Sequence, residues 1–383
     1  MKVSIIGSGT MGSGIAQIAA MNNCNVNLYD VCNESLENAK NKLHKILNRL
    51  SEKNKITKNE KQEALERICF TNKIEEIKNS NIVIEAIIEN INVKQETFAK
   101  VEEIIDQDCI LASNTSSLSI ASIAGSCKHA DRVIGIHFFN PAPLMPLVEI
   151  IPSIQTSKET LKKSRSIIDS WGKTTVITKD TPGFIVNRIA RPFYGEAIRI
   201  YEEGLANFST IDWAMEEIGG FRMGPFKLMD YIGHDVNYAV TETVFTSFYY
   251  DKRYIPSFTQ KRMVEAGYLG VKSGKGFYDY SKSTEINIDK DRELGKEILW
   301  RILAMLINEA ADAVMLNIAT KEDIDLAMTK GVNYPKGLLK WGDELGLENI
   351  LKTLEDLHKK YLEERYRPSP ILRKMIKEKT NFY

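Results

Sequence analysis

The amino-terminal half of the chain alternates short apolar runs with stretches of helical apolar spacing. Residues 2–6 (KVSII) have the pattern of a short buried strand, glycines follow at once, and Ile15, Ile18 and Ala19 then recur at the spacing of one helix face. Helical stretches such as residues 91–105 separate most of the later apolar runs. The strands expected from these runs are residues 26–30, 82–85, 109–112, 133–137 and 174–178. This alternation predicts the α/β class, with a Rossmann-type doubly wound parallel sheet.

Two other regions have a purely helical pattern. Residues 33–67 are polar but carry Leu36, Leu43 and Leu47 at helical spacing, which predicts one long helix or a helix pair. After Pro182 and Gly183 the chain has helical patterns almost throughout, with a break near 267–292. We therefore expect an all-helical part after the sheet. The domains predicted from these changes are 1–180, 181–283 and 284–383.

The helical part contains an internal repeat. The residues that pair at a constant offset of 113 are Arg188 and Arg301, Glu196 and Glu309, Ala197 and Ala310, Ile211 and Ile324, Asp212 and Asp325, Met215 and Met328, Gly224 and Gly337, Lys227 and Lys340, Asp230 and Asp343, and Gly233 and Gly346. The register then continues at an offset of 112, where Arg253 pairs with Arg365 and Met263 pairs with Met375. So constant a register predicts two tandem copies of one helical domain. The second copy has Trp300 where the first has Asn187, and it lacks the first copy's PGF and SGKGFY stretches, so we expect it to be catalytically silent.

Composition narrows the class of protein. The chain has 51 basic and 51 acidic residues, which argues against nucleic acid or an anionic membrane as its main partner. Its five cysteines include no CxxC pair, so neither a disulfide framework nor a metal site is expected. The chain begins with a strand pattern rather than a secretory signal, and no apolar run approaches the length of a membrane span. These features predict a cytoplasmic protein.

The glycine-rich segment after the first strand has the spacing of a dinucleotide-binding turn. Gly7 suits the tight turn, Gly9 lets backbone approach a pyrophosphate, and Gly12 allows close packing of helix on strand. Thr10 and Met11 lie within the same turn, where helix N–H groups can meet a phosphate. Asp30, at the end of the next strand, can accept hydrogen bonds from ribose hydroxyls and repel a 2′-phosphate. The alternative is a structural βα turn with a solvated aspartate; the context favours NAD(H) over NADP(H).

Three further segments carry polar residues that have both a structural and a catalytic interpretation. Residues 113–117 (SNTSS) follow an apolar run and could simply cap a helix. His137 follows another such run, with Glu149 twelve residues later, and a lone histidine there is more often a packed core residue. Asn187 lies at a helix start and could be an ordinary surface residue. None of the three segments decides the function alone.

Together these motifs resemble the 3-hydroxyacyl-CoA dehydrogenase family, including its short-chain 3-hydroxybutyryl-CoA members, over residues 1–282. The stretches in family order are GSGTMGSGIAQ, LASNTSSLSI, GIHFFNPAP, LVEI, DTPGFIVNR and KSGKGFYDY. The resemblance implies that His137 is the general base, that Glu149 orients it, and that Ser116 and Asn187 contact substrate oxygens. It also implies cofactor contacts near the nicotinamide, and with Asn114 the expected set is Glu89, Lys94, Asn114, Asn140 and Lys272.

The expected reaction is NAD-dependent oxidation of an (S)-3-hydroxyacyl-CoA to the 3-oxoacyl-CoA, and its reverse. An imidazole beside a carboxylate suits removal of the C3 hydroxyl proton, while hydroxyl and amide donors can hold the oxygen. The resemblance further suggests fatty acid β-oxidation and contact of residues 33–67 with the CoA moiety. Open alternatives are a dehydrogenase of a non-CoA 3-hydroxy acid, of carnitine or gulonate type, and a non-catalytic protein on this fold.

The acyl group and the assembly depend on finer features. Pro146 stands where relatives often have lysine, and residues 219–240 look closest to the phenylacetate-pathway branch, which acts on 3-hydroxyadipyl-CoA. Arg222 in that run could meet a distal carboxylate or be an ordinary surface arginine. In short relatives the single helical domain dimerises, so we expect the second copy to cover the same face within one chain, as an intramolecular pseudo-dimer. Further homo-oligomerisation through another surface stays open.

Overall fold

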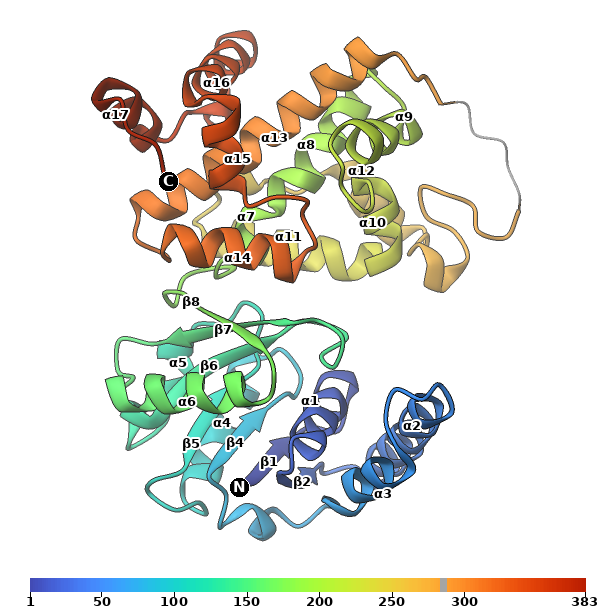
Figure 1. Cartoon of the computed structure of the whole chain (residues 1–383), viewed down its shortest axis with the longest axis vertical. Helices are drawn as coiled ribbons and strands as arrows, with labels where there is room; N and C mark the ends of the chain where they lie inside the picture. Colours follow the sequence, from blue (N-terminus) through green and yellow to red (C-terminus); the bar gives the residue numbers. More distant parts are fainter. Residues whose placement is uncertain (283–287) are drawn as a thin grey trace. The chain divides into compact units, whose positions relative to one another are not determined.

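The computed structural model describes residues 1–282 and 288–383. Contacts divide the chain into two compact units, Met1–Thr181 and Pro182–Tyr383 (Figure 1). The predicted boundary between residues 283 and 284 lies outside the described residues. The two helical copies predicted from the repeat therefore belong to one compact unit.

Unit 1 is built on an eight-stranded sheet in the order β3-β2-β1-β4-β5-β6-β7-β8. The strands are β1 (Lys2–Ile6), β2 (Asn25–Tyr29), β3 (Ile68–Thr71), β4 (Ile82–Glu85), β5 (Ile110–Ser113), β6 (Val133–Phe138), β7 (Leu147–Pro152) and β8 (Thr174–Ile177). Their apolar side chains form the core; Val3, Ile5, Ile84 and Ile136, for example, are fully buried. The sheet confirms the predicted α/β, Rossmann-type class.

Two details of the sheet differ from the prediction. Strands β3 and β7 were not expected, and β7 runs antiparallel to β6, with β8 parallel to β7. The sheet is therefore mixed rather than wholly parallel. The cause is the short β6–β7 connection of residues 139–146, because a parallel crossover needs a dozen residues or more.

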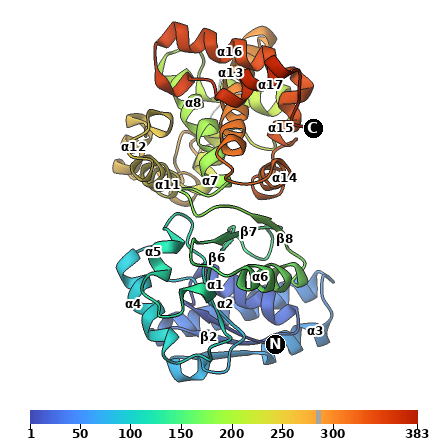
Figure 2. The same cartoon turned by 90° about the vertical axis from the view of Figure 1, so that its left-hand side faces the viewer.

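Helices pack around this sheet (Figure 2). They are α1 (Thr10–Met21), α2 (Asn33–Glu52), α3 (Lys58–Glu66), η1 (Ile74–Ile77), α4 (Ile91–Glu102), α5 (Ile120–Ala124), η2 (Ala130–Arg132) and α6 (Lys158–Ser170). Residues 33–67 form a pair of helices, α2 and α3, and not one long helix. A reciprocal capping box between Thr57 and Glu60 begins the second of them.

The named elements of unit 2 are all helices among its described residues, with a long central helix, α13 (Arg292–Met315), packed along α8 (Arg191–Glu202). Its other elements are α7 (Val186–Ile189), α9 (Phe208–Trp213), η3 (Ala214–Ile218), α10 (Pro225–Ile232), α11 (His234–Ser247), η4 (Lys252–Tyr254), α12 (Phe258–Glu265), η5 (Val271–Ser273), α14 (Lys321–Gly331), α15 (Leu338–Leu345), α16 (Leu347–Tyr361), η6 (Glu364–Tyr366) and α17 (Pro370–Glu378). Figures 1 and 2 both show α13 passing between the two sets of shorter helices.

The order of elements in unit 2 occurs twice. Helices α9, α10 and α11 begin 113 residues before α14, α15 and α16, and η4 and α12 begin 112 residues before η6 and α17. Local hydrogen bonds recur as well. Asp212 accepts from the backbone N–H groups of Phe226 and Lys227, and Asp325 accepts from those of Leu339 and Lys340. Each aspartate thereby fixes the start of a later helix, α10 in the first copy and α15 in the second.

One prediction about the second copy is wrong in part. The glycine-rich part of SGKGFY has no counterpart in it, but the aromatic pair does. Phe277 and Tyr278 donate their backbone N–H groups to Asp230, and Phe382 and Tyr383 donate theirs to Asp343, the counterpart of Asp230. The offset is 105 rather than 112 because the intervening turns were lost, which hid the match in the sequence.

Candidate functional site

The turn between β1 and α1 has the backbone of a phosphate cradle. Gly7 has φ +99°, and a Cβ there would lie 2.6 Å from the carbonyl oxygen of Ala86. A Cβ on Gly12 would lie 1.8 Å from the carbonyl oxygen of Gly7, so helix and turn can approach only without a side chain. Open space surrounds Gly9, the N-cap of α1, which has no side-chain cap. Thr10 and Met11 supply the next two N–H groups of the helix start. The cradle fits a dinucleotide pyrophosphate.

Asp30 lies directly after β2 and is held by the same turn. One carboxylate oxygen accepts from the N–H and the hydroxyl of Ser8, both at 2.8 Å, and the other accepts from the N–H of Cys32 at 3.0 Å. A carboxylate has lone pairs for further donors, so these bonds orient Asp30 and still allow ribose hydroxyls to bind. Ser8 was not among the residues expected from the sequence.

Beside the cradle, a buried acid organises the ends of β4 and β5. Glu85 forms an ion pair of 2.5 Å with Lys94 and accepts from the hydroxyl of Ser113 at 2.6 Å. Lys94 also pairs with Glu89 at 3.3 Å. A lone buried lysine would be costly, and the two carboxylates offset that cost. This group places Glu89 and Lys94, two of the expected cofactor contacts, side by side.

Ser116 is bound to Glu89. Its N–H and hydroxyl lie 3.0 and 3.3 Å from one oxygen of Glu89, and the hydroxyl of Thr115 donates to the same oxygen at 2.5 Å. Partial burial raises the pKa of Glu89, but the Lys94 ammonium and these hydrogen bonds lower it below its ordinary value overall. Ser119, and none of residues 113–117, caps helix α5. The cap interpretation of that segment is therefore wrong, and a structural role for Ser116 rests on Glu89 instead.

His137 and Glu149 face each other across the antiparallel strands β6 and β7. They are partners in the strand register, and Nδ1 of His137 lies 2.6 Å from Oε2 of Glu149. Both side chains are buried, and the ring of Phe139 lies 4.4 Å from the imidazole. The strand register thus fixes a histidine–carboxylate pair in the arrangement of an acid–base dyad.

The remaining expected residues of unit 1 surround the ends of these strands. Asn114 follows β5, and its side-chain oxygen accepts from the N–H of Phe138 at 2.8 Å, which ties it to the strand of His137. Asn140 is exposed and precedes Pro141 in a cis peptide. His137, Asn114 and Asn140 therefore all lie at or just beyond one end of β5 and β6.

Two expected residues belong to unit 2. Asn187 lies in the short helix α7, immediately before the buried Arg188. Lys272 lies in η5 and forms an exposed ion pair with Asp235, 2.5 Å apart. The roles of Asn187 and Lys272 stay predictions.

A family model described as "3-hydroxyacyl-CoA dehydrogenase, NAD binding domain" matches residues 2–181. The model of the "C-terminal domain" of that family matches residues 183–280 and again residues 298–381. The chain belongs to the 3-hydroxyacyl-CoA dehydrogenase family. This confirms the NAD cofactor and the dehydrogenase activity expected from the sequence.

Named relatives of this dehydrogenase cover most of its length. The 3-hydroxyadipyl-CoA dehydrogenase of Escherichia coli K12 is 38% identical, over 97% of this chain and 96% of its own. A probable 3-hydroxybutyryl-CoA dehydrogenase of Bacillus subtilis is 42% identical, over 74% of this chain and 98% of its own. The crystal structure of a 3-hydroxybutyryl-CoA dehydrogenase from E. coli K12 matches with a TM-score of 0.94, 36% identity and 98% coverage of each chain.

The dehydrogenase contains site residues that sequence reasoning missed. Ser8 and Glu85 orient the expected residues Asp30 and Lys94 rather than standing in a recognisable motif. Glu85 could have been found from the sequence, because it is an acidic residue at the end of the otherwise apolar strand IVIE. Within residues 1–282 and 288–383, none of the helices combines the length and apolar character needed to cross a bilayer.

Proposed function

We propose that the dehydrogenase oxidises the 3-hydroxyl of a short-chain (S)-3-hydroxyacyl-CoA, such as 3-hydroxybutyryl-CoA or 3-hydroxyadipyl-CoA, and catalyses the reverse reduction. The observation that carries the proposal is the buried contact of 2.6 Å between His137 and Glu149. The printed activities of the relatives support the choice of substrate. The setting we propose is fatty acid β-oxidation in the cytoplasm.

The turn after β1 and the residues beside it would hold the cofactor. The glycines and the start of α1 would bind the pyrophosphate, and Asp30 the adenosine ribose. Glu89, Lys94, Asn114, Asn140 and Lys272 are proposed to lie nearer the nicotinamide. Bound NAD⁺ supplies the acceptor for a hydride from C3 of the substrate.

His137 is the proposed general base. Its Nδ1 is engaged by Glu149, so Nε2 is the atom that takes the proton from the C3 hydroxyl. Glu149 would hold the ring and stabilise the imidazolium by its charge, because both groups are buried, where charges are poorly solvated. In the reductive direction the same imidazolium returns the proton.

Ser116 and Asn187 would hold the substrate oxygens. The bonds of Ser116 to Glu89 fix the position of its hydroxyl. An amide and a hydroxyl can stabilise a developing oxyanion without competing with His137 for the proton. The helix pair α2–α3 is the proposed contact for the CoA moiety, which distinguishes this function from oxidation of a free 3-hydroxy acid.

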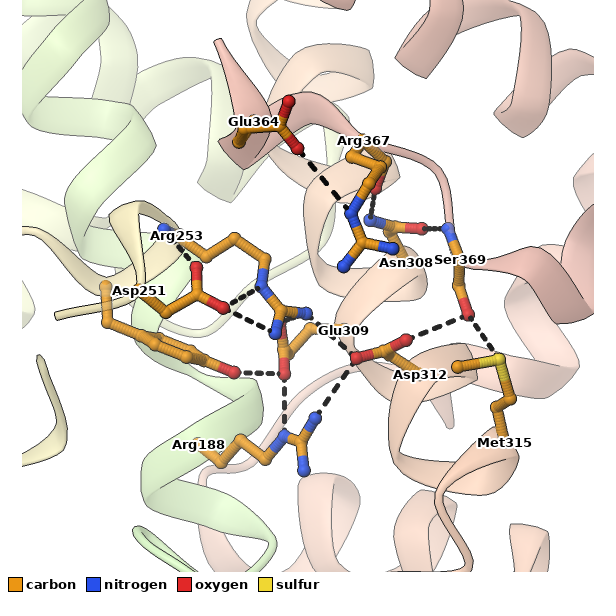
Figure 3. Close-up of polar contacts among 11 residues, drawn as sticks. Arg188, Asp251, Arg253, Asn308, Glu309, Asp312, Met315, Glu364, Arg367 and Ser369 are labelled. Atoms are coloured by element: carbon orange, nitrogen blue, oxygen red, sulfur yellow. Dashed lines mark hydrogen bonds and ion pairs between the residues drawn. The ribbon is translucent and has the colours of Figure 1, made fainter. Parts of the chain in front are cut away.

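The second helical copy is proposed to serve as a built-in dimer partner. Arg188 contacts Glu309 at 2.7 Å, and its counterpart Arg301 contacts Glu196, the counterpart of Glu309, at 2.5 Å (Figure 3 draws the first contact). The hydroxyl of Tyr254 likewise donates to Glu309, and that of Tyr366 donates to Glu196. Reciprocal contacts of this kind are the mark of an isologous interface. They support an intramolecular pseudo-dimer.

The test follows NADH formation with 3-hydroxybutyryl-CoA and, as control, with free 3-hydroxybutyrate. We expect turnover of the thioester only. His137→Ala should leave NAD⁺ binding near the wild-type level and lower kcat about 10²- to 10⁴-fold, the usual range for a general base. Glu149→Gln should also be impaired, since an amide cannot stabilise the imidazolium by charge. Near-normal turnover by His137→Ala would contradict the assignment.

A further inference from the structure

Arg191 is a buried cation without a buried anion. It is the first residue of α8 and only 6% exposed. Its Nε donates to the carbonyl oxygen of Asn187 at 2.9 Å and its Nη1 to the hydroxyl of Thr241 at 3.0 Å. Within residues 1–282 and 288–383, no carboxylate forms an ion pair with it. Burial lowers the pKa of Arg191, so the folded protein holds this charge at a cost.

Two other buried arginines of unit 2 show how unusual the lack of a carboxylate partner is. Arg188 pairs with Glu309 and Asp312, and Arg301 pairs with Glu196 and Glu203. Buried charges in proteins are normally paired, because an unpaired one forfeits its hydration without compensation. The guanidinium of Arg191 is thus the one among these three that has no carboxylate partner among the described residues.

The surroundings of Arg191 include a second unsatisfied group. The ring of Tyr194 lies 5.0 Å from the guanidinium carbon. The hydroxyl of Tyr334 is buried and has no hydrogen-bond partner among the described residues. Burial raises the pKa of Tyr334 well above its ordinary value, and the positive charge of Arg191 acts against that rise. The Tyr334 hydroxyl is thus a buried donor without an acceptor, and it lies near the Arg191 guanidinium, a buried cation without an anion. A small anionic group could bind to both.

The position of Arg191 connects this site to the substrate. Arg191 begins α8, four residues after Asn187 of α7, and its side chain is bonded to the backbone of Asn187, which keeps the two residues adjacent. Asn187 is the residue proposed to hold a substrate oxygen. An anion bound at Arg191 would therefore lie near the acyl group of the substrate.

We propose that Arg191 and the hydroxyl of Tyr334 bind a carboxylate at the distal end of the acyl chain, so that the dehydrogenase selects dicarboxylic 3-hydroxyacyl-CoA thioesters over those that end in a methyl group. This inference rests on the proposed function. Tyr334 comes from the second helical copy, where it is the counterpart of Phe221, and the two rings pack 5.0 Å apart. Arg191 has Ala304 as its counterpart, so the pair of groups occurs once. The silent copy would then contribute to substrate choice.

The experiment compares two thioesters of equal chain length, 3-hydroxyadipyl-CoA and 3-hydroxyhexanoyl-CoA, by NADH formation. The wild type should prefer the adipyl substrate. Arg191→Met should lower kcat/KM for it about 100-fold, and Tyr334→Phe about 10-fold, as expected for loss of hydrogen bonds to a charged group. Tyr334→Phe should keep kcat/KM for the hexanoyl substrate within about threefold of wild type. Arg191→Met also removes the bond to Asn187, so it should lower the hexanoyl value too, but by much less than the adipyl value. Arg222→Met, which removes the exposed arginine considered from the sequence, is the matched control and should change neither value.

Several outcomes would overturn the inference. They are a wild-type preference for the hexanoyl substrate, an equal loss on both substrates in Arg191→Met and Tyr334→Phe, and a selective loss in Arg222→Met. Tyr334→Phe keeps the ring and its packing, so it decides the question if Arg191→Met does not fold, which a thermal melt would reveal. A wild type that oxidises neither thioester would instead contradict the proposed function, which keeps the two failures distinct.

Discussion

The two helical copies in unit 2 keep the same framework and differ where a ligand is expected. Both retain the aspartate that binds the start of a following helix, Asp212 in the first and Asp325 in the second. Both retain the arginine that reaches a glutamate of the other copy, Arg188 and Arg301. These shared contacts are internal to the helical fold or to the contact between the copies. They are the contacts whose loss would leave a buried charge or a buried backbone N–H group unpaired.

The differences fall on the residues with proposed chemical roles. Asn187 corresponds to Trp300, Arg191 corresponds to Ala304, and the segment containing Lys272 has no counterpart. Phe382 and Tyr383 keep only the part of that segment that packs against the helices. The second copy thus lacks the residues with proposed catalytic roles, while it keeps the residues that contact the first copy. The following variants test that division.

Removal of the second copy should have the largest effect. A stop after Lys282 takes away α13, whose buried residues include Ile302, Leu306 and Ile307, and so exposes the apolar face of α8. We expect dimerisation, aggregation or loss of the cooperative melt, because so large an apolar surface is rarely left in water. Light scattering and a thermal melt of the full and shortened chains measure it. A shortened chain that stays monomeric, soluble and equally stable would refute the pseudo-dimer.

Loss of the reciprocal arginines should come next. Arg188→Met and Arg301→Met each leave a buried glutamate short of a cation, which costs about 3–5 kcal/mol in the free energy of unfolding. Arg301→Met should cost more, since Glu309 keeps Arg253 at 3.4 Å while no other cation pairs with Glu196 among the described residues. Denaturant titration measures both.

The matched control for this pair of variants is an exposed ion pair of the second copy. Arg373 pairs with Glu355, and their side chains are 58% and 43% exposed. Arg373→Met should therefore cost less than about 1 kcal/mol. If all three variants cost the same, the buried reciprocal contacts do not hold the copies together.

A third pair of variants, at Asn187 and Trp300, tests catalysis rather than stability. Asn187→Ala should lower kcat about 10²- to 10³-fold, the range for loss of one donor to a developing oxyanion. Trp300→Ala, at the equivalent place in the second copy, should leave kcat unchanged in the protein that remains folded. Steady-state rates normalised to NADH binding separate the two effects. Equal losses in both variants would mean that Asn187 acts only through packing.

The sequence predicted those features that depend on local patterns. Glycine spacing and strand–helix alternation located the cradle at Gly7 and Gly12 and the carboxylate of Asp30, because a turn with positive φ and a close helix approach tolerate few residue types. The repeat predicted from the constant register is also visible in the structure, because each copy forms the same local elements. Both predictions required only neighbours in the chain.

Features that depend on distant residues were missed or misread. The antiparallel direction of β7 follows from a connection length, but its four apolar residues after Pro146 do not by themselves signal a strand. Ser8 and Glu85 matter through partners that only the fold brings near. The buried state of Arg191 had no sequence signal, because an arginine at the start of a helix is usually exposed. Arg222, which from the sequence could meet a distal carboxylate or be an ordinary surface arginine, is exposed.

The smallest expected effect distinguishes Tyr278 from Tyr383, whose hydroxyls bind Asp212 and Asp325. The Tyr278 hydroxyl donates to Asp212 at 2.7 Å, and burial raises the pKa of Asp212 to about 7. Folded Asp212 thus holds its proton more tightly than the unfolded chain does, so its contribution to stability is full below the ordinary pKa of an aspartate and is lost as pH rises through about 7. The bond from Tyr278 limits that loss because it favours the charged form.

Tyr278→Phe should therefore cost little at pH 6 and about 1.5–3 kcal/mol at pH 8, where Asp212 is charged in the wild type. Tyr383→Phe should cost less at either pH, because Tyr383 is 52% exposed and water can replace its hydroxyl at Asp325. Denaturant titrations of both variants at the two pH values measure the difference. Equal costs at pH 6 and pH 8 for Tyr278→Phe would show that Asp212 stays protonated throughout. A larger cost for Tyr383→Phe would mean that the second copy, and not the first, depends more on its aspartate.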